Sequence, residues 1–178
     1  MSTETPRSIF VTVGTTQFDA LVERVCCQAA LELLASRGVG RLVVQHGRSP
    51  PPLPFAPLPE HPSFSLECYP FKPSLRDDLQ AADLVVSHAG AGSIMEVLEL
   101  GKPLLVVVND SLMDNHQAEL AGALSKRSHL VATTPSLLLD CLRIQLLPHS
   151  ALLSSLVPLP PVDPSLFPRL LSQALSSP

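Results

Sequence analysis

Short apolar runs alternate with amphipathic helical patterns along most of this 178-residue chain. Several of the runs end at glycine or polar residues, and the segments between them carry apolar residues at helical spacing. Strands that alternate with helices form a parallel sheet whose two faces those helices cover. The sequence therefore predicts an α/β fold, a Rossmann-like parallel sheet with helices on both faces, over residues 8–147. The expected strands are residues 8–13, 41–45, 64–69, 84–87, 104–108 and 130–132.

Capping and stop signals place the helices between these strands. Asp19 is expected to cap a single long helix over residues 20–37. Thr134 and Pro135 are expected to open a last helix over residues 136–147, because a hydroxyl before proline is typical of a helix start. The other expected helices are residues 74–82, a helix from near 92 to 101, and residues 115–126.

Two proline-rich segments interrupt this alternation. Seven of the 19 prolines lie between Pro50 and Pro62, which excludes a helix or a central strand there. An extended surface loop is expected, and a polyproline II ligand for a partner is the alternative. Residues 148–178 form a second proline-rich segment with one short helical candidate at 167–175. This tail is expected either to wrap onto the domain or to contact a partner.

Charge and cysteine content narrow the class of protein. The formal net charge is −4, and no basic stripe is visible, which argues against a nucleic-acid-binding protein. The apolar runs are far shorter than the roughly 20 residues that span a bilayer. The four cysteines form no C-x-x-C metal pair, so a reduced, cytosol-facing protein is expected. Cys68 and Cys141 lie in apolar surroundings and are expected to be buried packing residues.

Ligand binding is expected at one edge of the predicted sheet. Open parallel sheets bind ligands outside the carboxyl ends of their strands. Three loops rich in small and polar residues leave those ends, at residues 14–17, 88–93 and 109–117. All three are expected to face the same edge, which is the strongest functional indication in the residues themselves.

The segment HAGAGSIME, residues 88–96, carries the most specific pattern. Gly90 and Gly92 permit a tight turn and the close approach of a ligand. Ser93 lies at the start of a helix, where unpaired N–H groups favour an anion such as a diphosphate. Glu96, one turn further, can accept hydrogen bonds from a ribose. The alternative is an ordinary strand-to-helix turn with a solvated glutamate.

The other two loops allow two interpretations each. Residues 114–117 (DNHQ) offer amide groups that suit sugar hydroxyls, or they cap the next helix. Residues 14–16 (GTT) can hold a phosphate or a base, or they form an ordinary turn. The chain has no Asp-x-Asp or His-x-x-x-His pattern and no G-x-S-x-G elbow, which argues against a divalent-metal site and an α/β-hydrolase. The remaining histidines are expected to be surface or loop residues: His46, His61, His129 and His149.

Residues 9–143 resemble a known family. The signature residues resemble the donor-binding motif of GT-B glycosyltransferases that use UDP-sugars, in the order His88, Gly90, Ser93, Glu96, Gly101, Pro103 and Gln117. The segments FVTVGTTQFDALV, ADLVVSHAGAGSIMEVLELGKPL and LMDNHQAELA together resemble the small catalytic subunits of the UDP-N-acetylglucosamine transferase of dolichol-linked oligosaccharide synthesis. In this chain His116 precedes the glutamine, where many GT-B enzymes carry an acidic residue.

The resemblance implies a lobe equivalent to the C-terminal, donor-binding lobe of a GT-B enzyme, with UDP-N-acetylglucosamine as substrate and neither cofactor nor metal. It implies that His88, Gly92 and Ser93 contact the diphosphate and that Glu96 contacts the ribose. The general base is not evident in this chain and is assigned to the partner as one option. The full implied donor-binding set is Gly14, Thr15, His88, Gly90, Gly92, Ser93, Glu96, Asn115, His116 and Gln117.

A GT-B enzyme has two such lobes, roughly 300 residues together, and this chain is expected to supply one. The resemblance thus implies a heterodimer with a membrane-anchored, acceptor-binding subunit on the cytosolic face of the endoplasmic reticulum, with a free pool in the cytosol. The implied reaction moves N-acetylglucosamine, with inversion, to N-acetylglucosaminyl-diphosphodolichol. Two alternatives stay open: a non-catalytic nucleotide-sugar-binding or scaffold subunit, and a UDP-sugar epimerase, which needs its second lobe in the same chain.

Overall fold

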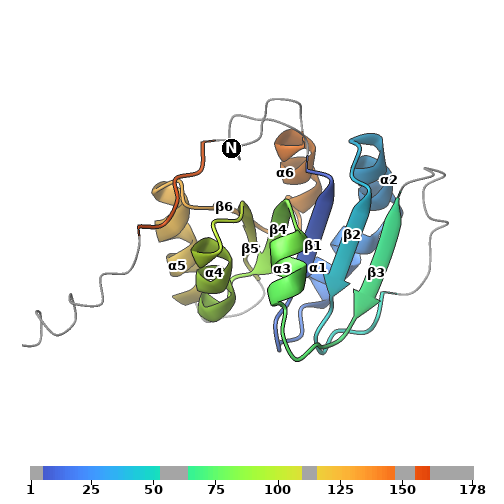
Figure 1. Cartoon of the computed structure of the whole chain (residues 1–178), viewed down its shortest axis with the longest axis horizontal. Coiled ribbons are helices and arrows are strands. Elements are labelled where there is room, and N and C mark those ends of the chain that lie inside the picture. Colours follow the sequence, from blue (N-terminus) through green and yellow to red (C-terminus); the bar gives the residue numbers. More distant parts are fainter. Residues whose placement is uncertain (1–5, 53–63, 110–115, 147–154, 161–178) are drawn as a thin grey trace, which may run out of the picture.

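The chain forms one parallel sheet with a helical layer on each face (Figure 1). A computed structural model describes residues 6–52, 64–109, 116–146 and 155–160, without the side chains of His116 and Gln117. Within these ranges six strands pair in the order β3-β2-β1-β4-β5-β6, all of them parallel. The strands are β1 (Ser8–Thr12), β2 (Arg41–Gln45), β3 (Ser65–Tyr69), β4 (Leu84–His88), β5 (Leu104–Val107) and β6 (Val131–Thr133).

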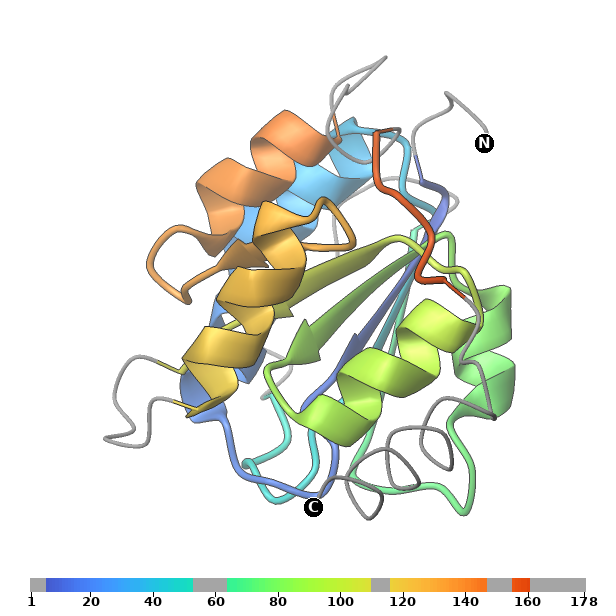
Figure 2. The ribbon, with the colours of Figure 1, turned by 90° about the vertical axis from the view of Figure 1, so that its left-hand side faces the viewer.

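The six helices of the described ranges divide between the two faces of the sheet (Figures 1 and 2). Successive strand residues point to opposite faces, so Ile9 and Val11 join one apolar cluster while Phe10 joins the other. The first cluster lies under α1, α2 and α6, and the second lies under α3, α4 and α5. The helices are α1 (Asp19–Cys26), α2 (Gln28–Ser36), α3 (Arg76–Ala81), α4 (Ala91–Glu99), α5 (His116–Lys126) and α6 (Leu138–Gln145).

The predicted fold class is confirmed, and each predicted strand is found within one residue of its expected bounds. The single helix predicted over residues 20–37 is wrong, because the chain is extended at Cys27 (ψ 154°). An unbroken helix of that length would run about 27 Å, whereas a five-residue strand is only about 17 Å long. The break therefore lets both halves stay packed on a short sheet. The backbone carbonyl of Cys27 then accepts the first hydrogen bonds of α2.

Both predicted helix caps are wrong. Asp19 is the first residue of α1 rather than its cap, and its Oδ2 accepts a hydrogen bond from Gln17 Nε2 at 2.9 Å. The hydroxyl of Thr134 is hydrogen-bonded to Ser136 Oγ at 2.9 Å, so it does not cap α6. Instead a turn precedes α6, and the helix begins at Leu138.

Several predictions about exposure change in the structure. Cys68 is exposed because β3 is an edge strand of the sheet, and Cys141 is only half-buried. His46 is buried, not on the surface, and its Nδ1 is hydrogen-bonded to the carbonyl of Ser49 at 2.8 Å. His129 is half-buried in the loop between α5 and β6, as predicted for a loop residue, and His61 and His149 lie outside the described residues.

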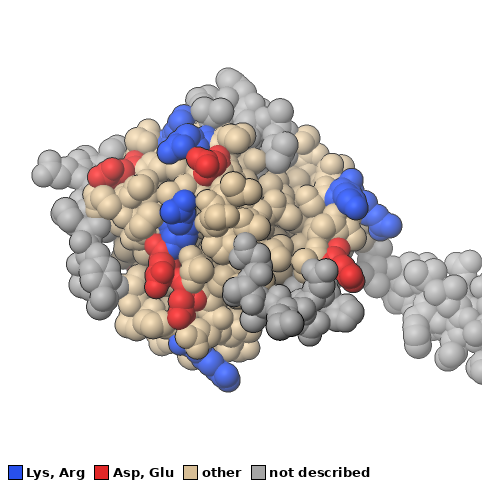
Figure 3. Space-filling view, turned by 180° about the vertical axis from the view of Figure 1, so that it is seen from behind, with Lys and Arg blue, Asp and Glu red and all other residues tan. Residues whose placement is uncertain are grey.

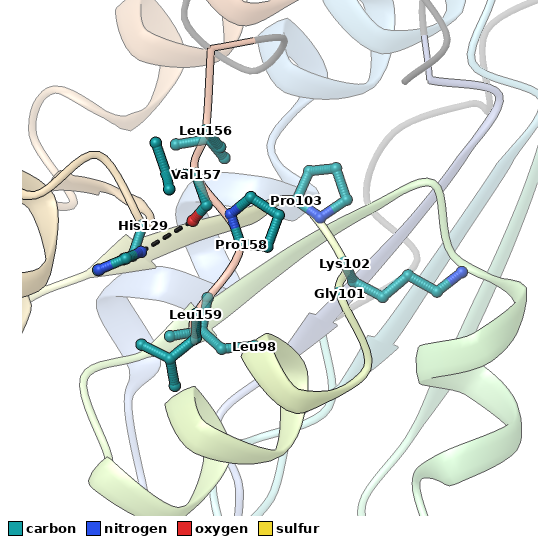
Figure 4. A pocket seen from close by; sticks show the side chains of 9 residues that line it. All are labelled: Leu98, Gly101, Lys102, Pro103, His129, Leu156, Val157, Pro158 and Leu159. Carbon is teal, nitrogen blue, oxygen red and sulfur yellow. Dashed lines mark hydrogen bonds between the residues drawn. The ribbon is translucent and has the colours of Figure 1, made fainter. Parts of the chain in front are cut away.

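One part of the C-terminal tail lies on the domain. Val157 N donates a hydrogen bond to the Ser128 carbonyl at 2.7 Å, and His129 Nδ1 donates to the Val157 carbonyl at 2.8 Å (Figure 4). The small pocket that this segment encloses with Leu98 and Pro103 lies at the start of β5, at the end of the sheet opposite the predicted ligand edge. Most of the proline-rich loop, the predicted boundary at residue 147 and the predicted helix at 167–175 lie outside the described residues.

Candidate donor-binding site

The sheet has a switch point between β1 and β4. The chain builds β1, β2 and β3 outward in one direction and then returns to place β4 on the other side of β1. Open sheets bind ligands in the crevice that such a reversal leaves at the carboxyl ends of the strands. Because β1 and β4 are direct neighbours, the loops that follow them lie next to each other. The predicted loops around Gly14 and His88 are therefore brought together.

His88 lies at this switch point. It ends β4, and its residue is only 8% exposed. Its ring lies between two glycines: a Cβ on Gly14 would lie 2.7 Å from His88 Cε1, and a Cβ on Gly90 would overlap His88 Nε2. No larger residue fits at either position while the ring stays in place. A side chain at either position would therefore displace the His88 ring.

The His88 ring carries an unsatisfied polar atom. Within the described residues, Nδ1 is buried and has no hydrogen-bond partner. Burial lowers the pKa of His88 from its usual value, although the nearby backbone of Thr12 acts in the opposite direction. The ring is therefore neutral at pH 7, and each of its nitrogens is either a donor or an acceptor.

Helix α4 begins directly after this ring. Its N-cap residue, Gly90, has an extended backbone and no side chain that could cap the helix. The first turn contains no acidic residue, so the positive end of the helix dipole is not neutralised there. A Cβ at Gly92 would meet nothing within 4 Å, so the space beside this turn is open. The geometry suits an anionic ligand such as a diphosphate.

The remaining predicted residues lie at the same edge where the structure describes them. Ser93 is half-buried and Glu96 is exposed, and three residues apart on α4 they share one face of the helix. Thr15 is exposed on the turn after β1. Helix α5 starts at this end of the sheet with His116 and Gln117 (Figure 2).

The side chains of His116 and Gln117, and the whole of Asn115, lie outside what the structure describes. The sugar-binding role of this segment, residues 115–117, stays a prediction.

The sequence analysis missed a buried hydrogen-bond hub beneath the turn at Gly14. Thr12 Oγ1 donates to Gln45 Oε1 at 2.6 Å, and Gln45 Nε2 donates to the Gly14 carbonyl at 2.7 Å and to the Pro70 carbonyl at 2.6 Å. The available signal was one polar residue at the end of each of two otherwise apolar strand runs. A polar side chain at such a position needs buried partners.

A second polar cluster fixes the loop after β3. Lys72 Nζ lies 2.9 Å from Asp78 Oδ2 and 3.9 Å from the centre of the Tyr69 ring. The Tyr69 hydroxyl donates to the same carboxylate at 2.5 Å. Burial, followed by this contact, raises the pKa of Tyr69, so the phenol stays protonated. The cluster joins the end of β3 to α3.

Three other classes of ligand are nucleic acids, metal ions and membranes, and each requires a recognisable feature of charge, side-chain grouping or helix length. Figure 3 shows the face made by α1, α2 and α6, where the charged side chains of the described residues are of both signs and form no basic patch. Within the described ranges, no three His, Cys, Asp or Glu side chains are grouped so that they could hold a metal ion. No helix in those ranges is both long and apolar enough to cross a membrane.

Comparison with known proteins identifies the family of this domain. Residues 8–151 match the family model of the glycosyltransferase family 28 C-terminal domain. The mouse (Mus musculus) UDP-N-acetylglucosamine transferase subunit ALG13 is 55% identical over 126 residues, which cover 70% of this chain and 10% of that protein. The subunit of the same name from Cryptococcus neoformans is 35% identical over 156 residues, covering 72% of this chain and 78% of the relative. The chain thus spans about a tenth of the mouse relative and over three quarters of the fungal one.

Solved structures agree with the family model. The NMR solution structure of ALG13 superposes with a TM-score of 0.60 at 26% identity and covers 98% of both chains. The crystal structure of MurG from Acinetobacter baumannii gives a TM-score of 0.64 at 20% identity, over 97% of this chain and 50% of that one, which shows the shared fold. The chain therefore belongs to the ALG13 family, and its residues 8–151 form a glycosyltransferase family 28 C-terminal domain.

Proposed function

We propose that this chain is the donor-binding, catalytic subunit of a two-chain glycosyltransferase. The enzyme moves N-acetylglucosamine from UDP-N-acetylglucosamine to N-acetylglucosaminyl-diphosphodolichol. Membership of the ALG13 family supports this substrate pair. The observation that carries the proposal is the uncapped start of α4, which follows the buried His88 directly at the switch point of the sheet.

The donor is proposed to lie along α4 with its diphosphate at the start of that helix. His88, Gly92 and Ser93 contact the diphosphate, because the unpaired backbone N–H groups of this turn and the neutral ring supply donors there. Glu96 accepts hydrogen bonds from the ribose hydroxyls. The opposite wall and the sugar pocket are assigned to Gly14, Thr15, Gly90, Asn115, His116 and Gln117.

In the proposed reaction the acceptor hydroxyl attacks the anomeric carbon while UDP departs, and the configuration at that carbon inverts. Negative charge grows on the leaving diphosphate during this step. The backbone amides and dipole at the start of α4 stabilise that charge, so the proposal assigns no step to a metal ion. A group that takes the acceptor proton is not assigned to this chain, and the partner lobe is proposed to contribute it.

The second lobe is proposed to belong to another polypeptide, which is anchored in the membrane and binds the lipid acceptor. The relatives are named as subunits, which supports a partner chain. MurG, of which this chain covers 50%, supports the need for a second lobe. The proposed location is the cytosolic face of the endoplasmic reticulum, which the chain reaches through its partner.

The test is a donor-binding titration followed by a transfer assay. The full chain, purified together with whatever subunit accompanies it from cells, is titrated with UDP-N-acetylglucosamine and with UDP-glucose as a control. Saturable binding that prefers UDP-N-acetylglucosamine, with transfer to the dolichol-linked acceptor, supports the proposal. The absence of any binding would refute it. Binding without transfer in the complex would favour the non-catalytic subunit instead.

A further inference from the structure

We propose that Gln45 and Thr12 are positioning residues of the donor site, which hold the turn after β1 against the ring of His88. The inference rests on the proposed function and deepens it, since neither residue belongs to the donor-contacting set. Each is only 1% exposed, so both act from beneath the crevice and not from its surface. They pair in register across β1 and β2, at the ends of those strands.

The Gln45 amide makes three hydrogen bonds. Its oxygen accepts from Thr12 Oγ1 at 2.6 Å, and its nitrogen donates to the carbonyls of Gly14 at 2.7 Å and Pro70 at 2.6 Å. Thr12 Oγ1 also accepts from Gly14 N at 3.0 Å. Both backbone polar groups of Gly14 are therefore bound by this pair of side chains.

The bound turn is the one that touches His88. Gly14 has a positive φ of 62°, a backbone conformation that glycine adopts without strain. A Cβ on it would meet three atoms of the His88 ring, at 2.7, 3.4 and 3.6 Å. Any shift of this turn therefore opens or closes the space in which the ring lies. The hub thus acts on the donor through Gly14 and His88.

The loop after β2 supports the same turn from outside. Gly47 N donates to the Pro70 carbonyl at 3.2 Å, and Arg48 N donates to the Thr16 carbonyl at 3.0 Å. A Cβ on Gly47 would lie 2.5 Å from the Thr16 carbonyl oxygen. The ends of β1, β2 and β3 are in this way joined into one unit, and Gln45 is the side chain common to all three.

The first test compares two buried glutamines of this chain. Gln45→Met removes the hub with little change in side-chain volume, and Gln145→Met is the matched control in α6, where Gln145 is 4% exposed. Kd for UDP-N-acetylglucosamine and Tm are measured on the full chain with any co-purified subunit. We expect Gln45→Met to weaken donor binding about 10- to 100-fold, because displacement of a contact group by about 1 Å can cost that much. Gln145→Met is expected to lower Tm but to change Kd by no more than about twofold. Such a change is small beside the tenfold change in Kd that about 1.4 kcal/mol produces.

The second test uses the hydroxyl. Thr12→Val keeps the β-branched shape and loses both hydrogen bonds, whereas Thr12→Ser keeps them. Thr12→Val is expected to raise Kd and the KM for donor with a much smaller change in kcat, and Thr12→Ser restores both. The NMR signal of the His88 ring is expected to shift in Thr12→Val and Gln45→Met but not in Gln145→Met, a change that a loss of stability alone does not produce.

The results separate this inference from the proposed function. If wild type binds the donor while Gln45→Met and Thr12→Val bind it equally well, the positioning role is wrong and the proposed function stands. Equal weakening of binding by Gln145→Met would also overturn the positioning role. If wild type itself does not bind the donor, the proposed function fails and the positioning role fails with it. If Gln45→Met does not fold, the comparison of Thr12→Val with Thr12→Ser tests the positioning role.

Discussion

Replacing Gly90 by alanine moves the His88 ring and introduces little backbone strain. Gly90 has φ −73° and ψ 126°, a conformation that any residue adopts. The added Cβ would overlap His88 Nε2 and lie 2.9 Å and 3.0 Å from Cε1 and Cδ2 of the ring. Carbon atoms in van der Waals contact lie about 3.5–4.0 Å apart, so the ring has to move by about 1 Å.

The cost follows from this displacement. Overpacking of this kind lowers the free energy of unfolding by about 1–3 kcal/mol. A contact group displaced by about 1 Å loses up to about 100-fold in its function, or about 2.7 kcal/mol of donor affinity. Gly90→Ala is therefore expected to remain folded at 25 °C and to bind UDP-N-acetylglucosamine far more weakly than wild type does.

Isothermal titration calorimetry with UDP-N-acetylglucosamine measures the affinity, and thermal denaturation measures the stability. Gly122→Ala is the matched control, because it lies within α5 and its added Cβ would meet nothing within 4 Å. It is expected to gain up to about 1 kcal/mol of stability, as alanine is the better helix former, with unchanged donor affinity. Wild-type donor affinity in Gly90→Ala would refute the reasoning, because the ring would then have no part in binding.

Three further predictions concern single side chains. Glu96→Ala is expected to weaken donor binding and to raise the donor KM strongly, with no change in Tm, since Glu96 is exposed; an unchanged KM would exclude the ribose contact. Burial holds the pKa of His88 below its usual 6.5, so the unfolded chain binds the proton first and the free energy of unfolding falls as pH drops below about 6.5. His88→Gln should flatten that part of the stability profile in urea titrations, and an unchanged slope would contradict the burial argument. Lys102→Met is expected to lose about 1–3 kcal/mol of stability, because Lys102 Nζ donates to the carbonyls of Gln80 at 2.5 Å and Ala82 at 2.9 Å; an unchanged Tm would show these bonds to be without net effect.

The sheet could be predicted because its strands are buried on both faces. Such strands appear in the sequence as continuous apolar runs, and β2 and β4 are clear examples. The break at Cys27 could not be predicted in the same way, since residues on both sides of it continue one helical apolar pattern. The length of the sheet on which the helices pack decides where that segment breaks, and no local pattern carries that length.

The position of the candidate site was predictable from the sequence, but the contacts within it were not. The position of the loops follows from a general rule for parallel sheets, so the edge that holds Gly14, His88 and Gly92 was predictable. The contacts within it depend on strand register, which is set by pairing between distant segments. Thr12 faces Gln45 across β1 and β2 and Ser87 across β1 and β4, so the hub and the His88 ring meet at Gly14 only in the assembled sheet.

The account depends on where the nucleotide binds, and a crystal structure of the chain with UDP measures that directly. We expect the diphosphate oxygens within hydrogen-bond distance of the backbone nitrogens at residues 91–93, beside the His88 ring, with the ribose next to Glu96. A nucleotide bound away from the start of α4, for example in the pocket beside Val157, would contradict the account.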